Sequence, residues 1–61
     1  MRLKLRAKRV EKNYTQEELA LALGVATATY NRWEKGYTEI SITMINKLLK
    51  ILDCKYEDIF L

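Results

Sequence analysis

The side chains of this chain that could do chemistry are mostly cationic, and they gather in its first part. Residues 1–36 contain eight lysines and arginines against four glutamates, a net charge of +4, whereas residues 37–61 contain three basic and four acidic residues, a net charge of −1. Lysine and arginine neutralise phosphates and release their counterions, so this division suits a surface that binds a polyanion. A merely solvated helix face is the alternative, and charge alone favours the polyanion only slightly.

Catalytic chemistry is poorly supported by the residue types. The chain has no histidine, and Ser41 and Cys54 are its only serine and its only cysteine, so no nucleophile is paired with a base. Glu17 and Glu18 are adjacent and would point about 100° apart on a helix, which is not a catalytic carboxylate pair. A metal site is equally poorly supported without histidine or a second cysteine. We therefore expect no enzyme, no catalytic residue, no metal and no cofactor.

Length and composition predict one small globular domain over residues 1–61. Apolar residues make up 49% of the chain and charged residues 31%, a balance typical of folded domains. A chain this short buries only about 60% of its unfolded surface, so a second copy would add useful burial. The single cysteine cannot form an internal disulfide, and neither an apolar run of about 18 residues nor a signal-peptide pattern occurs. We expect a cytoplasmic protein without membrane contact.

Apolar spacing and capping residues predict that five short helices position these side chains. The first helix covers about 2–12, with Leu3, Ala7 and Val10 recurring at helical spacing. The alternation of apolar and basic residues over 1–5 would also suit a strand, and this alternative stays open.

Two helices should meet at Gly24. The helix before it begins with the capping box Thr15-Gln16-Glu17-Glu18, in which the threonine hydroxyl accepts from an amide three residues on and the last glutamate reaches back. Glycine turns with a positive φ at little cost, so Gly24 ends this helix. The next helix begins at about Ala26 or Thr27 and ends at Lys35. It turns Tyr30 and Trp33 to the core, and base stacking on these rings is the less favoured alternative. Its other side presents Thr27, Ala28, Asn31 and Arg32.

Two further helices complete the prediction. Ser41 suits the N-cap of a fourth helix, which has an amphipathic stripe made of Ile45, Leu48, Leu49 and Leu52. Residues 54–60 suit one last short turn of helix that closes the core, with Cys54 as a small buried hydrophobic residue. The expected fold class is therefore all-α.

Three fragments, in order and with matching gaps, carry a resemblance to a known family. They are Thr15-Gln16-Glu17-Glu18-Leu19-Ala20, Leu23-Gly24-Val25 and Arg32-Trp33-Glu34-Lys35-Gly36. Together they strongly resemble the Cro/C1-type, or XRE-like, family of helix-turn-helix transcriptional regulators of phages and bacteria. The ending Tyr56-Glu57-Asp58-Ile59-Phe60 is similar to that family's ending as well. The resemblance implies a five-helix, lambda-repressor-like DNA-binding domain with its helix-turn-helix over about 16–35.

The resemblance implies that the helix after Gly24 lies in the major groove of double-stranded DNA, where each base pair has a distinct pattern of donors and acceptors. Four residues would then read bases: Thr27, Ala28, Asn31 and Arg32. The planar fork of Arg32 suits the two acceptors of guanine, Asn31 could pair with adenine, and Ala28 could touch a thymine methyl. The alternative for each of these residues is an ordinary solvated surface position.

The resemblance also implies contacts that hold the protein on DNA without reading its sequence. Gln16, at the start of the second predicted helix, is similar to a family glutamine that contacts the phosphate backbone, and Lys35 and Tyr37 would stand near a phosphate. Arg9 would pair with Glu34 and tie the first helix to the end of the third. Arg9 is therefore expected to be structural.

The chain departs from the family pattern at some helix ends. Ala26 stands where a capping serine or threonine is common, so Thr27 could cap the third helix instead and would then be less free to contact a base. Asp53 and Lys55 replace a glycine and a capping serine, which could make the last turn irregular.

Family habit and small size together suggest a homodimer. We expect it to act as a repressor, and activation is the alternative that the sequence leaves open. Each subunit would read one half of a palindromic operator, with half-sites roughly 10 base pairs apart. Candidate interface residues are the apolar ones left after the core is filled, namely Met44, Ile51, Tyr56, Phe60 and Leu61. No small-molecule ligand is evident.

The alternative function is a protein-binding module. Such a protein would keep the helix-turn-helix shape but use its third helix against a partner protein, for instance a toxin or an anti-repressor, with little specific DNA binding. The salt dependence of binding distinguishes DNA binding from protein binding. Binding through several phosphates weakens steeply with ionic strength, and an apolar protein contact does not.

Overall fold

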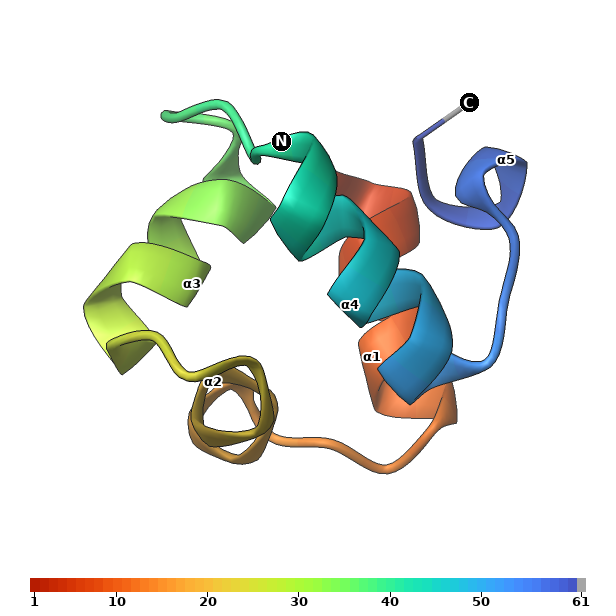
Figure 1. The fold of residues 1–61 in the computed structure, drawn as a ribbon, viewed down its shortest axis with the longest axis horizontal. Helices are drawn as coiled ribbons and strands as arrows, with labels where there is room; N and C mark the ends of the chain where they lie inside the picture. The colour runs from red at the N-terminus through yellow and green to blue at the C-terminus, as the bar shows by residue number, and fades with distance from the viewer. Residues whose placement is uncertain (61) are drawn as a thin grey trace.

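The computed structural model describes residues 1–60, which form five helices. They are α1 (Leu3–Glu11), α2 (Gln16–Leu23), α3 (Thr27–Lys35), α4 (Ile42–Leu52) and α5 (Tyr56–Phe60). The predicted all-α, five-helix architecture is confirmed; no strand occurs among the described residues, and the alternating segment at the start enters α1 at Leu3. Figure 1 shows α3 and α5 on opposite sides of the molecule, with α4 between them.

Local capping signals set the boundaries of α2. The Thr15 hydroxyl accepts from the Glu18 amide at 3.0 Å, and the Glu18 carboxylate accepts from the Thr15 amide at 2.9 Å, which completes the predicted capping box. At the other end Gly24 has a φ of 78°, a left-handed conformation that favours glycine. The chain can therefore turn sharply between α2 and α3.

The helix ends that depart from the family pattern are nevertheless ordered. Ala26 is the N-cap of α3 and gives no side-chain cap, so Thr27 is the first helical residue and does not replace it. Asp53 ends α4 in the left-handed region with a φ of 49°. The Asp58 carboxylate accepts from the Lys55 amide at 3.0 Å, and α5 begins regularly at the next residue.

The core lies where the five helices meet. Its largest fully buried side chains are Leu5, Leu19, Leu23, Tyr30, Leu48 and Leu52. Trp33 is also buried and meets Tyr30 edge to face, with 6.2 Å between ring centroids. Both rings therefore belong to the core, and they are not available as a platform for stacking bases.

The buried face of α1 differs from the predicted one. Leu3 and Val10 are 61% and 56% exposed and Ala7 is exposed as well, whereas Leu5 and Arg9 point inward. The apolar spacing was misleading because a charged residue can occupy a buried helix face when another element supplies its counter-ion. Here α3 supplies that counter-ion.

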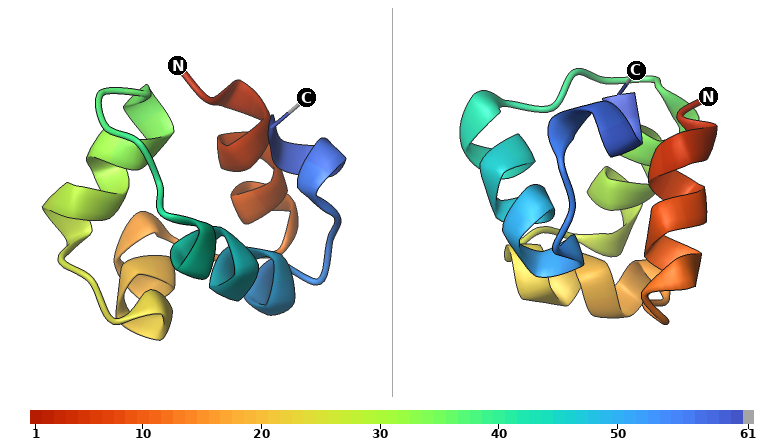
Figure 2. Two further views of the ribbon diagram at one scale, coloured as in Figure 1. Left: turned by 45° about the horizontal axis from the view of Figure 1, so that its top comes forward. Right: turned by 90° about the vertical axis from the view of Figure 1, so that its right-hand side faces the viewer.

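The last helix, α5, packs against α1. Figure 2 shows α5 beside the N-terminal half of α1 in both views, and these two helices are in direct contact. Ile59 of α5 is buried and belongs to the core. The Tyr56 and Phe60 rings stack on α5 with 4.9 Å between centroids.

Candidate nucleic-acid interface

The outer face of α3 presents accessible side chains close to the turn at Gly24. Thr27, Ala28 and Arg32 are exposed and Asn31 is half-buried, while the inner face of the helix holds the two core aromatic residues. The helix has no acidic residue in its first turn, and its last turn contains two basic residues. This face can therefore approach an anion without a repelling carboxylate of its own.

A shallow, open hollow of the surface lies against this face of α3. It is lined by Gln16, Thr27, Ala28, Asn31, Arg32, Lys35 and Tyr37. These are the seven residues for which sequence analysis predicts contacts with DNA, and the structure brings all of them together. They come from the start of α2, the length of α3 and the loop that follows it.

Behind the hollow, a buried ion pair joins α1 to α3. The Arg9 Nε donates to Glu34 Oε2 at 2.5 Å, and both side chains are nearly inaccessible to water. A second nitrogen of Arg9 donates to the Tyr14 carbonyl at 2.7 Å, which also ties the segment after α1 to this pair. The Tyr30 hydroxyl donates to the same Glu34 oxygen at 2.6 Å. The pair therefore fixes how α3 sits on α1.

The charge state of this pair follows from its partners. Burial by itself would raise the pKa of Glu34, but hydrogen bonds from Arg9, Tyr30 and Gln16 outweigh it, and the pKa is lowered. The Glu34 carboxylate raises the pKa of Arg9 in return, mainly through their hydrogen bond. Burial and the bond to Glu34 raise the pKa of Tyr30. At neutral pH the pair is thus fully ionised and Tyr30 keeps its proton.

Two of the candidate residues, Gln16 and Asn31, contact each other, which the sequence did not reveal. The Gln16 Nε2 donates to Glu34 Oε1 at 3.0 Å, and the Asn31 Nδ2 donates to Gln16 Oε1 at 3.0 Å. The sequence contains no signal for this arrangement, because Gln16 and Asn31 lie on different helices. This arrangement places the Gln16 amide, which lines the hollow, in direct contact with Glu34 of the buried ion pair.

A second contact that the sequence did not reveal holds the end of α3. The Arg2 backbone N–H donates to the Glu34 carbonyl at 2.7 Å, and its guanidinium donates to the carbonyls of Trp33 at 2.6 Å and Thr38 at 3.1 Å. The last carbonyls of a helix have no partner within the helix, so a cation there satisfies them and favours the helix dipole. Arg2 thus fixes the segment that carries Lys35 and Tyr37.

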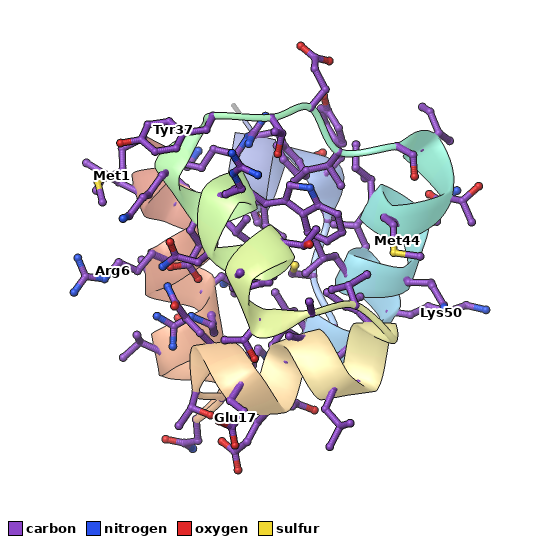
Figure 3. The ribbon with its side chains drawn as sticks, turned by 90° about the vertical axis from the view of Figure 1, so that its left-hand side faces the viewer. Met1, Arg6, Glu17, Tyr37, Met44 and Lys50 are labelled. Atoms are coloured by element: carbon purple, nitrogen blue, oxygen red, sulfur yellow. The ribbon has the colours of Figure 1, made fainter. Side chains whose placement is uncertain are left out.

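Cations and an aromatic ring border the hollow. The Lys35 Nζ lies 5.9 Å from the centroid of the Tyr37 ring, and Tyr37 is 72% exposed. Figure 3 looks onto α3 and shows Arg6 and Lys50 pointing outward on opposite flanks, while Glu17 points away below α2. The cations that line the hollow itself are Arg32 and Lys35.

The described residues that are candidates for a dimer interface lie on α4 and α5. Met44, Ile51 and Phe60 are half-buried and pack partly against the core, and Tyr56 is 45% exposed on α5. Leu61 lies outside the described residues. Cys54 is also only half-buried, which differs from the full burial expected of it, and burial raises the pKa of its thiol.

Residues 1–60 contain no group of three or more side chains that could hold a metal ion. Each helix in this part of the chain also falls short of the length and apolar character needed to cross a membrane.

Comparison with known families and proteins identifies the architecture. Residues 5–59 match the helix-turn-helix family HTH_3. The whole chain is 41% identical over 61 residues to an HTH-type transcriptional regulator of Methanocaldococcus jannaschii, covering 92% of that protein, and 38% identical to one of Archaeoglobus fulgidus, covering 86%. The family resemblance predicted from the sequence is thus confirmed, and these relatives come from archaea.

Two solved structures are similar as well. One is the restriction-modification controller protein C.AhdI from Aeromonas hydrophila, with a TM-score of 0.83 and 32% identity over 93% of this chain and 86% of that one. The other is SinR, a master regulator for biofilm formation, solved in complex with DNA, with a TM-score of 0.83 and 29% identity over 95% of this chain and 97% of that one.

Proposed function

Because this chain belongs to the helix-turn-helix family of Cro/C1-type transcriptional regulators, which bind DNA and are not enzymes, we propose that it binds a specific DNA sequence by placing α3 in the major groove. The observation that carries this proposal is the hollow over α3, where all seven candidate DNA contacts converge. An α-helix fits the major groove, and the exposed side of α3 is the side that would face the bases.

In this proposal Arg32 is the principal base reader. Its side chain is exposed and makes no hydrogen bond to any residue in the described part of the chain, so its donors are available. A bidentate contact from arginine to the O6 and N7 atoms of guanine is the commonest specific contact in the major groove. Ala28, one turn earlier, would approach a thymine methyl, and Thr27 would reach a base or a phosphate.

Three further residues would position the protein on the phosphate backbone. Gln16, the first residue of α2, lines the hollow, and so do Lys35 at the end of α3 and Tyr37 in the loop after it. Contacts of this kind set the register of the helix in the groove but carry no sequence information themselves. They would make the affinity depend on salt.

We further propose that the protein acts in the cytoplasm as a homodimeric repressor. Two copies related by a two-fold axis would read a palindromic operator with half-sites roughly 10 base pairs apart. The exposed Tyr56 and its stacked neighbour Phe60 support an interface that includes α5. An operator overlapping a promoter would then be occluded when the dimer binds.

The proposal is tested by selecting binders from a random pool of double-stranded DNA at one moderate salt concentration. Wild type is run beside Arg32→Ala and beside Lys12→Ala, a matched loss of charge at an exposed position after the end of α1. We expect wild type and Lys12→Ala to enrich the same inverted repeat. Arg32→Ala should relax the preference at one base pair per half-site.

The same selection can reject the proposal. Weak, salt-sensitive retention without an enriched sequence would mean that the protein is not a specific regulator, and the protein-binding module would become the better hypothesis. An enriched sequence that is not an inverted repeat would keep DNA recognition and remove the symmetric dimer.

A further inference from the structure

A chain of hydrogen bonds runs from the buried ion pair to the surface that would face DNA. It leads from Glu34 Oε1 to the Gln16 amide nitrogen at 3.0 Å, and from the Gln16 amide oxygen to the Asn31 Nδ2 at 3.0 Å. Glu34 is buried, whereas Gln16 and Asn31 are half-buried and line the hollow. The buried Glu34 carboxylate therefore influences the orientation of the Asn31 amide at the surface.

The direction of every bond in this chain is determined by its buried end. An ionised carboxylate only accepts hydrogen bonds, so Gln16 must turn its NH₂ group and not its oxygen toward Glu34. The Gln16 oxygen can then accept a hydrogen bond from Asn31, which must donate through its NH₂ group. The amide of Asn31 consequently has one preferred orientation instead of two.

That orientation leaves a particular edge of Asn31 unused. One of its two amide hydrogens goes to Gln16, and the side chain makes no other hydrogen bond within residues 1–60. One N–H and the carbonyl oxygen remain. An N–H paired with a carbonyl oxygen is the set that matches the N7 acceptor and the N6 donor of adenine.

We propose that Gln16 is a specificity-determining residue that acts through Asn31: the hydrogen-bond chain from Glu34 orients the Asn31 amide so that this position prefers adenine. The inference rests on the proposed function and adds a role for Gln16 besides its contact with the backbone. Gln16 has a second amide hydrogen, so it can donate to a phosphate while it holds Asn31.

The two roles of Gln16 predict different effects of its removal. Loss of a phosphate contact weakens binding to all sequences alike. Loss of a positioning contact weakens discrimination at the single base pair that Asn31 reads and leaves other base pairs unaffected. The second pattern cannot arise from a general loss of folded protein, because that would lower the affinity for every operator equally.

The test measures dissociation constants for the selected operator and for a set of operators with each half-site base pair changed in turn. The proteins are wild type, Gln16→Ala, Asn31→Ala and the double variant. We expect both single variants to lose discrimination at the same A·T pair by about 5- to 150-fold, the range for one bidentate base contact. The double variant should lose no more discrimination than Asn31→Ala alone, since the two residues act as one unit.

A matched control is available in the same turn of α2. Glu17 is exposed and points away from α3 in Figure 3, so Glu17→Ala should keep the wild-type preference at that base pair. If Gln16→Ala does not fold, Gln16→Met has a similar length without hydrogen-bonding groups and replaces it. Thermal unfolding of each variant confirms that folded protein is compared.

Several results would overturn the inference. A uniform loss of affinity in Gln16→Ala leaves Gln16 as a backbone contact only. Loss of preference at different base pairs in the two single variants, or additive losses in the double variant, removes the coupling while the proposed function stands. Failure of wild type to prefer any operator removes the proposed function and this inference with it.

Discussion

At Glu34, four hydrogen bonds converge on one buried carboxylate. Two come from the Arg9 guanidinium, one from the Tyr30 hydroxyl and one from the Gln16 amide. Removing one partner of such a pair leaves a buried charge without compensation, which typically costs about 3–5 kcal/mol. A domain of this size has little stability to spare, so these contacts matter at the scale of single residues.

The first prediction concerns Tyr30→Phe. The change keeps the ring in the core and removes one donor to Glu34, and a hydrogen bond to a charged group contributes about 1.5–3 kcal/mol. Urea unfolding at pH 7 should show a loss in that range with an unchanged dependence on denaturant. A loss below about 0.5 kcal/mol would mean that the other three bonds are sufficient for the carboxylate.

The second prediction concerns pH. The pKa of Glu34 is lower in the folded protein than its ordinary value, so its contribution is complete above the unfolded pKa of about 4.3 and is lost as pH falls through the folded value. Unfolding free energies measured from pH 7 to pH 3 should therefore decline at the acid end. In Tyr30→Phe the pKa is lowered less, and the decline should be complete at a higher pH. The same loss of unfolding free energy at acid pH in wild type and Tyr30→Phe would contradict this prediction.

The third prediction concerns Lys35 and depends on the proposed function. If its ammonium neutralises one phosphate, Lys35→Ala should reduce the slope of log affinity against log salt by about 0.9 for each bound subunit. The preference among operators should stay as in wild type, because a backbone contact carries no sequence information. Titrations at four salt concentrations, with Lys12→Ala as control, measure the slope; an unchanged slope would mean that Lys35 does not contact phosphate.

At the scale of elements, the start of α3 is less well capped than the starts of α2 and α4. Thr15 and Ser41 each accept from an amide three residues on, whereas Ala26 has the same extended backbone and no oxygen to offer. A missing cap leaves a helix amide without a side-chain partner. The helix that would enter the groove therefore begins with a local weakness.

The fourth prediction follows from this comparison. Ala26→Ser should raise the free energy of unfolding by about 0.5–2 kcal/mol, and Ser41→Ala should lower it by a similar amount, since capping energies fall in that range. Both are measured by urea unfolding against wild type. No gain from Ala26→Ser would show that the backbone at this turn does not bring the serine oxygen to the α3 amides.

At the scale of the whole molecule, several apolar side chains are exposed, and two of the surfaces that they form are candidates for a dimer interface. One is on α5, where Tyr56 stacks on Phe60, and the other is the stripe of Leu3, Ala7 and Val10 on α1. A chain of 61 residues has a small core, and a second copy on either surface would add burial. We favour α5 because two aromatic rings, Tyr56 and Phe60, stack on it and Tyr56 is exposed.

The fifth prediction separates these surfaces. Tyr56→Glu places a charge on the α5 surface and should shift the protein from dimer to monomer in sedimentation equilibrium, with little change in helix content. Leu3→Glu, the matched change on α1, should leave the dimer intact. The opposite result would move the interface to α1, and monomeric wild type at all concentrations would remove the proposed dimer.

Most of the fold could be predicted from the sequence because the signals are local. The capping box at Thr15, the glycine at the left-handed turn after α2 and the serine cap of α4 act within one helical turn, so neighbouring residues suffice to place them. Helical spacing also predicted the outward side of α3, whereas Gln16, Lys35 and Tyr37 of the hollow were implied by the family resemblance.

What the sequence by itself determined, then, is the order of the helices, their ends and the outward face of α3, because capping and helical periodicity depend only on nearby residues. Tertiary packing alone decided that α1 turns Leu5 and Arg9 inward, that Arg2 holds the end of α3, and that Gln16 joins Glu34 to Asn31. Each of these depends on which helix lies across from the residue. That neighbour is supplied by residues 15 or more positions away in the chain, which no local pattern can specify.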